Sequence, residues 1–271
     1  MSEAPLLDIR NLSVRFSESA PPAVKDVSIR VNAGTRVGII GESGSGKSVT
    51  AMSILRLNDE RIARYGDDSS ITLDGRELLK APLSAIQKVR GAEASMIFQD
   101  PMSVLNPVFR VGQQVRDVLV AHRPELRKSA RARVIDSLDA VGIRNPAVVY
   151  RQYPHELSGG MRQRVMIAMA IASSPRLLIA DEATSALDVT VQAAVLETLG
   201  ALADERDMAV LMITHDMGVV ARFCDYVYVM YHGDVVESGA AADILTAPQH
   251  DYTKKLLASV PRLHGDQPRT A

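Results

Sequence analysis

Two patterns of apolar residues along the chain predict two kinds of β-strand. Residues 9–16, 27–31 and 71–73 alternate apolar and polar positions, which is typical of antiparallel strands with one buried face. Residues 177–180 and 210–214 are apolar throughout except for Thr214 at the end, as expected for strands buried on both faces of a parallel sheet. The chain therefore combines a small antiparallel β-layer with a parallel core.

Helical spacing fills the intervals between these strands. Apolar residues recur with a helical period over residues 111–141, which predicts an inserted helical lobe, and a long helix is expected over residues 189–205. Residues 94–98 are predicted to form a strand that ends at Gln99, and residues 226–230 and 235–237 are predicted to form a hairpin. Alternation of strands and helices supports a parallel sheet.

Composition narrows the class of protein. The 271 residues are 46% hydrophobic and 23% charged, with a net charge of −1, so we expect a globular protein without the basic field that attracts nucleic acid. The one cysteine, Cys224, excludes an internal disulfide and is interpreted as a core residue. No secretory signal is seen, and apolar runs such as residues 165–172 are too short to span a bilayer.

One glycine-rich segment carries the clearest chemistry. It lies between an apolar strand-like run at residues 36–40 and a predicted helix at residues 49–55, and it fills every fixed position of GxxxxGK[ST]: Gly41-Glu42-Ser43-Gly44-Ser45-Gly46-Lys47-Ser48. In such a loop, backbone N–H groups surround the β-phosphate, the lysine neutralises the β and γ oxygens, and the serine hydroxyl ligates Mg²⁺. The helix that follows adds the positive end of its dipole. A nucleoside triphosphate is predicted here, in preference to a flexible Gly/Ser loop.

A second candidate site lies where a buried strand ends in two acids. Asp181 and Glu182 follow the strand at residues 177–180, at the carboxyl edge of the sheet, where ligands bind. We expect Asp181 to hold Mg²⁺, directly or through a water, and Glu182 to accept a proton from the water that attacks the γ-phosphate. The alternative is an acid pair that caps a helix, but the phosphate loop requires a magnesium carboxylate and favours the metal site.

A second glycine-containing segment precedes a predicted helix over residues 162–172. Ser158 is suited to cap this helix, and Gly159 and Gly160 follow it. Helix N-termini bind anions through free N–H groups, so the chain has two such elements where one nucleotide needs only one phosphate loop. Taken alone, the segment could equally be a plain loop.

Six motifs in order resemble the ATP-binding subunit of an ABC transporter over nearly the full length. They are the phosphate loop, Gln99 after a strand, Leu157-Ser158-Gly159-Gly160, the acidic strand end at Glu182, Ser185-Ala186-Leu187-Asp188, and His215 after a strand. The resemblance implies an α/β P-loop NTPase fold with a RecA-like parallel sheet core, an antiparallel β-subdomain and an inserted α-helical lobe. It also implies one nucleotide-binding domain over residues 1–271: core and β-subdomain in 1–99 and 158–240, helical subdomain in 100–157, and a peptide-importer-type tail in 241–271.

The resemblance assigns roles to individual residues. Gln99 resembles the Q-loop glutamine, which contacts Mg²⁺ or the attacking water, and His215 resembles the switch histidine that hydrogen-bonds the γ-phosphate. With Lys47 and Glu182, they are the expected catalytic residues. Asp188 resembles the aspartate of the loop that joins two subunits. Without the family pattern, His215 would be an ordinary polar residue at a strand end.

Two further positions depart from a clear match. Phe16 aligns roughly with the aromatic that stacks on adenine, and a core aromatic on an edge strand is the alternative. Met161 stands where the family signature most often has Gln, a replacement common in peptide-importer relatives. Activity is therefore still expected.

Three local runs, at residues 99–107, 153–157 and 248–257, narrow the resemblance to the peptide and nickel importer subfamily. Asp251 replaces the proline that is usual in the last run, and the cysteine-rich extension of some relatives is lacking. The expected function is an ATPase that powers uptake of di- or oligopeptides, with ATP and Mg²⁺ as cofactors. The alternatives are import of nickel or another small solute, or a soluble ABC ATPase of DNA repair or translation.

The same resemblance implies partners. Ser158, Gly159 and Gly160 of one subunit would close over ATP in the phosphate loop of a second ABC ATPase subunit, in a head-to-tail homodimer or heterodimer. Two transmembrane permease subunits and an extracytoplasmic solute-binding protein would complete the assembly on the cytoplasmic face of the membrane, without nucleic acid. Repair and translation members are disfavoured because the chain lacks a long coiled-coil insertion and a second ATPase module, and a GTPase would need an Asn-Lys-x-Asp motif.

Overall fold

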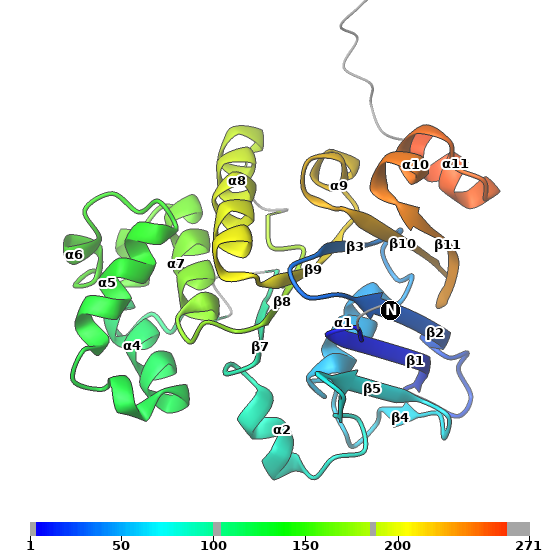
Figure 1. Ribbon diagram of the computed structural model, residues 1–271, viewed down its shortest axis with the longest axis horizontal. Coiled ribbons are helices and arrows are strands. Elements are labelled where there is room, and N and C mark those ends of the chain that lie inside the picture. The colour runs from blue at the N-terminus through cyan, green and yellow to red at the C-terminus, as the bar shows by residue number, and fades with distance from the viewer. Residues whose placement is uncertain (1–3, 100–103, 185–187, 259–271) are drawn as a thin grey trace, which may run out of the picture.

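A computed structural model describes residues 4–99, 104–184 and 188–258. It contains two β-sheets and a group of helices that lies to one side of them (Figure 1). The helices are α1 (Lys47–Ile54), α2 (Leu83–Val89), α4 (Val111–His122), α5 (Ala130–Ala140), α6 (Pro146–Val149), α7 (Gly159–Ile171), α8 (Val189–Arg206), α9 (Met217–Phe223), α10 (Ala241–Thr246) and α11 (Asp251–Ala258).

The first sheet is the antiparallel layer that the alternating pattern predicted. β1 (Leu7–Arg15) pairs with β2 (Val24–Val31) on one side and β5 (Ser70–Leu73) on the other. β4 (Arg64–Tyr65) pairs with β1, and β6 (Arg76–Glu77) pairs with β5. These two short strands were not expected, because two residues are too few to show a period.

The second sheet is the parallel core. Its six strands lie in the order β11-β10-β3-β9-β8-β7, and all neighbours are parallel except β11, which runs antiparallel to β10. The strands are β3 (Arg36–Ile40), β7 (Ala94–Ile97), β8 (Leu177–Asp181), β9 (Ala209–Thr214), β10 (Tyr226–Tyr231) and β11 (Asp234–Ala240). The P-loop NTPase arrangement of parallel core, antiparallel β-layer and helical lobe is confirmed.

Side-chain alternation along the buried strands divides the interior into two cores. Ile39 of β3 packs with the antiparallel layer, whereas its neighbour Ile40 packs with the helices on the other face. On β8, Ile179 and Leu178 divide in the same way. Successive residues of a strand point to opposite faces, so continuous apolar runs were the correct signal for strands covered on both sides.

The predicted helical stretch over residues 111–141 is two helices, α4 and α5. Arg123 ends α4 with backbone angles of φ −135° and ψ 66°, outside the helical region. Pro124 follows it, and the residue before a proline is disfavoured in the α conformation. α4, α5 and α7 pack against one another and, with α6, form the lobe at the left of Figure 1.

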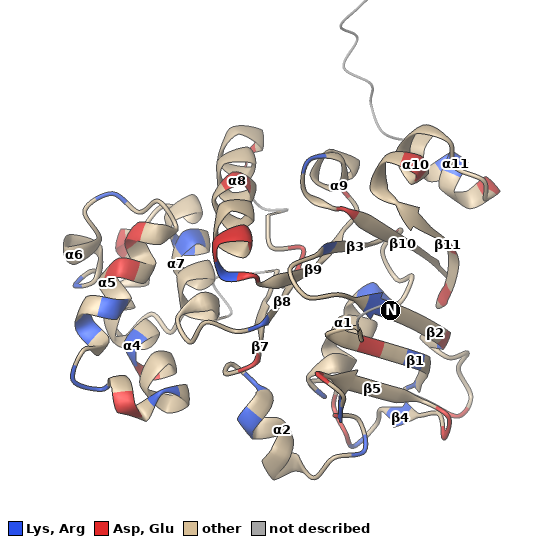
Figure 2. Cartoon of the chain, in the orientation of Figure 1, with Lys and Arg blue, Asp and Glu red and all other residues tan. Residues whose placement is uncertain are grey.

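Charged residues of both signs are interleaved over the helices, whereas the central strands are mostly uncharged (Figure 2). This distribution agrees with the net charge of −1. Cys224 is buried, and burial raises the pKa of its thiol to about 12, so the thiol stays protonated at neutral pH. Its interpretation as a core residue is confirmed.

Candidate active site

The glycine-rich loop connects β3 to α1, as predicted, but the helix begins at Lys47, two residues earlier than expected. Gly46 is its N-cap, with φ 103°, and a Cβ at this position would lie 2.5 Å from the carbonyl oxygen of Ala23. At Gly41, a Cβ would lie 2.2 Å from the carbonyl oxygen of Met230. Both positions therefore require glycine, because the neighbouring backbone leaves no room for a side chain.

Lys47 is buried within the loop, at 5% exposure. Its ammonium donates hydrogen bonds to the carbonyl oxygens of Gly41, at 2.8 Å, and Glu42, at 2.7 Å. Burial lowers the pKa of Lys47, while Glu182 and Asp181 act in the opposite direction. The acceptors of this ammonium are neutral carbonyl oxygens, and its hydrogen bonds to charged phosphate oxygens would be stronger.

Ser48 and Asp181 lie together at the start of α1. The Ser48 hydroxyl donates to Oδ1 of Asp181 at 3.0 Å, and Asp181 is 8% exposed. Burial raises the pKa of Asp181, and the hydrogen bond from Ser48 and the charge of Lys47 oppose the shift. A hydroxyl and a carboxylate are hard oxygen donors, the type that Mg²⁺ prefers, so these residues fit the predicted ion.

Three strand ends meet at Glu182. The side-chain amide of Gln99, which follows β7, donates to Oε2 of Glu182 at 2.8 Å, and Nδ1 of His215, which follows β9, lies 3.1 Å from Oε1. β7, β8 and β9 are adjacent in the sheet, so their carboxyl ends bring these side chains together. Glu182 has φ 46°, a left-handed conformation that is uncommon outside glycine and is often found at functional sites.

The phosphate loop opens into a pocket of about 380 Å³. Its lining residues are Ala23, Ser43, Gly44, Gly46, Lys47, Ser48, Val49, Gln99 and Glu182. No local motif marks Ala23, which precedes β2 and reaches the loop through the pairing of β1 with β2. Phe16 is not among the lining residues; it is partly buried against the core of the antiparallel layer. Its contact with adenine stays a prediction.

The second glycine segment forms the beginning of α7, away from this pocket. Ser158 is its N-cap, as predicted, and its Oγ accepts a hydrogen bond from Met161 N at 3.3 Å. α7 begins at Gly159, three residues earlier than expected, so Gly159 and Gly160 contribute N–H groups to its first turn. In Figure 1, α7 lies with the helical lobe, well separated from α1.

Asp188 caps the other long helix near the site. Its Oδ1 accepts a hydrogen bond from Val191 N at 2.9 Å, at the start of α8. The rest of that motif, residues 185–187, lies outside the described residues, as do residues 100–103 after Gln99. Neither Asp188 nor the Ser158–Gly160 segment lines the phosphate pocket.

Gln163 is a polar residue near the site that motif reasoning missed. It lies on α7, is 1% exposed, and its side-chain amide donates to the carbonyl oxygen of Ala183. Ala183 follows Glu182, so this bond ties the helix of the second glycine segment to the acidic strand end. Its local signal is weak, because Gln163 lies between two arginines, two residues before the apolar run at residues 165–171.

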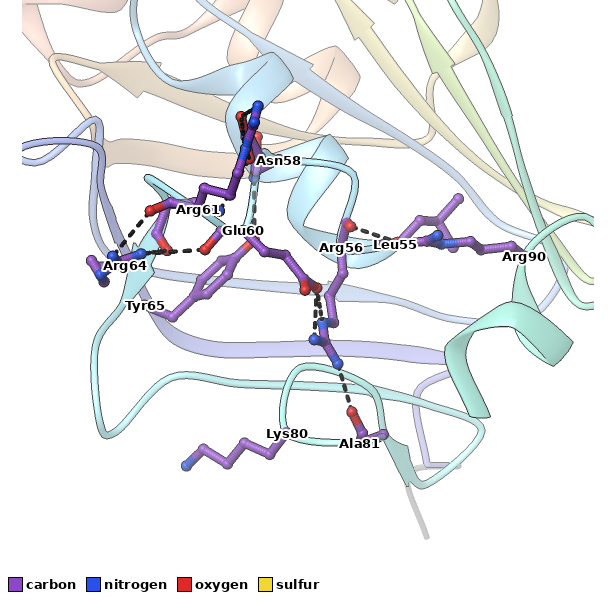
Figure 3. Close-up of polar contacts among 12 residues, drawn as sticks. Leu55, Arg56, Asn58, Glu60, Arg61, Arg64, Tyr65, Lys80, Ala81 and Arg90 are labelled. Carbon is purple, nitrogen blue, oxygen red and sulfur yellow. Dashed lines mark hydrogen bonds and ion pairs between the residues drawn. The ribbon is translucent and has the colours of Figure 1, made fainter. Parts of the chain in front are cut away.

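The far end of α1 is also fixed, as Figure 3 shows. The guanidinium of Arg90 donates to the carbonyl oxygens of Leu55 and Arg56, both at 2.8 Å. Asn58 donates to the carbonyl oxygen of Val49 and to the hydroxyl of Tyr65. A cation at the carboxyl end of a helix complements the helix dipole, so Arg90 stabilises the helix whose other end faces the phosphates.

The family model described as "ABC transporter" matches residues 24–185, more than half of the chain, from β2 past the acid pair. The chain belongs to the ABC transporter family. This ABC subunit is thus an ATP-binding protein and an ATPase. The model described as "Oligopeptide/dipeptide transporter, C-terminal region" matches residues 236–271, which agrees with the predicted subfamily.

Curated relatives cover nearly all of this ABC subunit. It is 46% identical over 271 residues to a putative peptide import ATP-binding protein of Brucella melitensis, covering 99% of this chain and 81% of that one. It is 47% identical to the oligopeptide transport ATP-binding protein OppD of Haemophilus influenzae, covering 97% and 81%. The glutathione import ATP-binding protein GsiA of Pectobacterium atrosepticum is 46% identical, with 97% of this chain and 43% of that protein covered.

Solved structures of ABC cassettes have the same fold. A dimeric post-hydrolysis state of the cassette MJ0796 bound to ADP and Pi superposes with a TM-score of 0.76 at 25% identity, covering 87% of this chain and 98% of that one. CbiO1 from Clostridium perfringens gives a TM-score of 0.75 at 26% identity, covering 89% and 91%. Within the described residues, no helix of this ABC subunit combines the length and the apolarity that crossing a membrane requires.

Proposed function

We propose that the chain is the ATPase subunit of an importer and powers uptake of di- or oligopeptides through partner permease subunits. The observation that carries this proposal is the meeting of Gln99 and His215 on Glu182, beside a phosphate loop that contains Lys47. A structural ion pair has no need of an amide, an imidazole and a carboxylate at three neighbouring strand ends beside a phosphate pocket. Hydrolysis of a terminal phosphate needs such groups, because the attacking water and the γ-phosphate must both be positioned.

Binding of ATP begins with the loop, residues 41–48. Its N–H groups and the start of α1 receive the β-phosphate, and Lys47 exchanges the carbonyl oxygens of Gly41 and Glu42 for phosphate oxygens. Ser48, Asp181 and Gln99 would hold Mg²⁺, and the bound ion would neutralise the charge that develops on the phosphates. In the same proposal, Phe16 stacks on the adenine ring.

Hydrolysis follows from the surroundings of Glu182. Its carboxylate accepts a proton from the attacking water, and Gln99 positions that water or the metal. His215 lies 3.1 Å from the same carboxylate and turns to hydrogen-bond the γ-phosphate. Each oxygen of Glu182 faces one of these two side chains. In the proposal, rotation of Gln99 and His215 leaves the carboxylate to the attacking water and brings His215 to the γ-phosphate.

A second subunit completes each site in this proposal. Ser158, Gly159 and Gly160 of one subunit, with Asp188, close over ATP bound in the phosphate loop of the other, in a head-to-tail homodimer or heterodimer. The exposed first turn of α7 supports this, as does the dimeric state named for the MJ0796 cassette. The domain division at residues 99, 158 and 240 and a peripheral position on the cytoplasmic face of the membrane belong to the same proposal.

The solute class is inferred from the relatives, whose names include peptide, oligopeptide and glutathione import. A solute-binding protein and two permeases would supply specificity and the path. The test is uptake of a radiolabelled dipeptide, a labelled pentapeptide and radioactive nickel by cells with and without the gene, complemented by the wild type or by Glu182→Gln. Loss of peptide uptake restored only by the wild type supports the proposal. Loss of nickel uptake alone, or unchanged uptake of all three, contradicts it.

A further inference from the structure

The C-terminal helix α11 touches the phosphate loop through one side chain. Oη of Tyr252 accepts a hydrogen bond from the backbone N–H of Glu42 at 2.9 Å, across 210 positions of sequence. Glu42 is the second residue of the loop and is itself exposed. The Tyr252 hydroxyl therefore holds the first part of the loop from outside the pocket.

The other side of the same peptide unit is held by a group that nucleotide binding disturbs. This peptide joins Gly41 to Glu42, and its carbonyl oxygen, that of Gly41, accepts from Lys47 Nζ at 2.8 Å. The next carbonyl oxygen, that of Glu42, accepts from Lys47 Nζ at 2.7 Å and from Ser45 N at 3.2 Å. When Lys47 turns to phosphate oxygens, its hydrogen bonds to these loop carbonyl oxygens are lost. The bond from Glu42 N–H to Tyr252 is on the opposite side of the peptide and is unaffected by that exchange.

Tyr252 is itself firmly placed. It is 8% exposed, and its ring lies 4.1 Å from the ring of Tyr231, the last residue of β10. Burial raises the pKa of the Tyr252 hydroxyl, with the Glu42 N–H acting in the opposite direction, so the phenol stays neutral at physiological pH. β10 also supplies the Met230 carbonyl that lies against Gly41. The ring is thus fixed to the strand that already bounds the loop.

The helix that carries Tyr252 is attached to the sheet by Glu237 of β11. Its carboxylate accepts hydrogen bonds from Gln249 N at 2.7 Å and His250 N at 3.1 Å, immediately before α11. Burial acts to raise the pKa of Glu237, but these N–H donors, together with the side chain of Thr253, act in the opposite direction, and the pKa lies below its usual value. An ionised Glu237 therefore fixes the start of α11, one turn from Tyr252.

We propose that Tyr252 is a positioning residue of the ATPase site, through which α11 sets the conformation of the phosphate loop. It makes no contact with substrate in this proposal; it acts through the peptide unit that joins Gly41 to Glu42. Because Tyr252 lies in the segment matched by the oligopeptide/dipeptide transporter C-terminal region, residues 236–271, that region becomes part of the nucleotide site. The inference rests on the proposed function only for its kinetic consequence.

Tyr252→Phe tests this in the full chain, because it removes Oη and keeps the ring against Tyr231. Amide hydrogen exchange at Glu42, followed by NMR without nucleotide, should become at least about tenfold faster, since the N–H loses its acceptor. The KM for ATP should rise about three- to tenfold with kcat within twofold of the wild type, which corresponds to the loss of one neutral hydrogen bond. Tyr226→Phe is the matched control: it removes a phenol hydroxyl from β10, the strand that carries Tyr231, where that hydroxyl bonds to Ser238, and it should change neither measurement.

Glu237→Ala supplies a second, independent variant. It should raise the KM for ATP in the same direction, and the double variant with Tyr252→Phe should be no worse than the poorer single variant, because both act through one bond. Equal Glu42 exchange in wild type and Tyr252→Phe would overturn the proposal, as would a fall in kcat without a change in KM. If the wild type hydrolysed no ATP, the proposed function would fail while the exchange experiment still decided the contact.

Discussion

The chain has two helix N-termini that begin in glycine-rich segments, and they differ in almost every respect. α1 begins inside a pocket, after Gly46, with a buried lysine and a carboxylate beside it and without a side-chain cap. α7 begins on the surface, and Ser158 caps it through Met161 N. A Cβ at Gly159 would meet no atom of the described residues within 4 Å, whereas one at Gly46 would strike backbone.

This difference indicates which helix N-terminus can bind ATP within one chain and which needs a second chain. At α1, glycine is required by the chain itself, because Ala23 and Met230 approach the loop. At Gly159, nothing within the described residues requires glycine, so the requirement is expected to come from a ligand that approaches from outside. We infer that the first N-terminus binds ATP in its own subunit and the second binds ATP of a partner. The predictions below test that division.

The largest effect is expected at the acidic strand end. Glu182→Gln keeps the size and hydrogen-bonding reach of the side chain but removes the base, so kcat should fall by about 100- to 10,000-fold. ATP binding should remain within severalfold of the wild type. Phosphate release measures kcat and binding of a fluorescent ATP analogue measures affinity, with Glu205→Gln at an exposed position of α8 as control. Turnover at the parental rate would refute the role of Glu182.

A charge at the second N-terminus should prevent dimer closure without harming the chain. Gly159→Asp in the Glu182→Gln background places a carboxylate where a partner's triphosphate would lie, and like charges in contact cost several kcal/mol, roughly 100-fold or more in dimer affinity. The same carboxylate is favourable for the start of α7, so thermal stability should not fall. Sedimentation with ATP measures the dimer, and Gly159→Ala is the mild counterpart. An undiminished dimer in Gly159→Asp would contradict the division.

Lys47→Ala should affect the first N-terminus alone. A hydrogen bond that involves a charged group contributes about 1.5–3 kcal/mol, so ATP affinity should fall about 10- to 100-fold. Isothermal titration with ATP and Mg²⁺ measures this, and Lys88→Ala on the exposed face of α2 is the control. If Lys47→Ala bound ATP as tightly as the control, the phosphate site would have to lie elsewhere.

The smallest expected effect concerns the cap itself. Ser158→Ala removes the acceptor for Met161 N and should lower the free energy of unfolding by about 1 kcal/mol. Urea denaturation of the nucleotide-free chain measures it, and Ser158→Asn should restore most of the loss because Asn also caps helices. A Ser158→Ala variant as stable as the wild type would show that the hydroxyl has no structural role in α7.

The sequence predicted the site best where motifs are local. Lys47 and Ser48 are fixed by the loop, and Asp181 and Glu182 by the strand that precedes them, so each could be placed from its neighbours. Ser158 was likewise predicted as a cap from the helix that follows. The order of strands in the parallel core was not predicted, and it is this order that brings Gln99 and His215 to the same carboxylate.

Contacts between distant segments carried no comparable signal. Tyr252 reaches Glu42 because α11 folds back onto β10, and a tyrosine in a short helix has nothing in its own neighbourhood to indicate this. The seven residues of α2 are too few for a helical period to stand out. The start of α7 was placed late because two glycines suggest a loop, whereas the Ser158 cap allows them in the first turn.

The strand that leads into the phosphate loop has a consequence for how the molecule melts. Ile39 and Ile40 are both fully buried and belong to different cores, so β3 cannot leave one core intact while the other dissolves. The antiparallel layer and the helical side should therefore unfold in a single cooperative step, visible as one calorimetric peak whose van't Hoff and measured enthalpies agree. ATP bound at the end of β3 would then raise the melting temperature of the entire polypeptide.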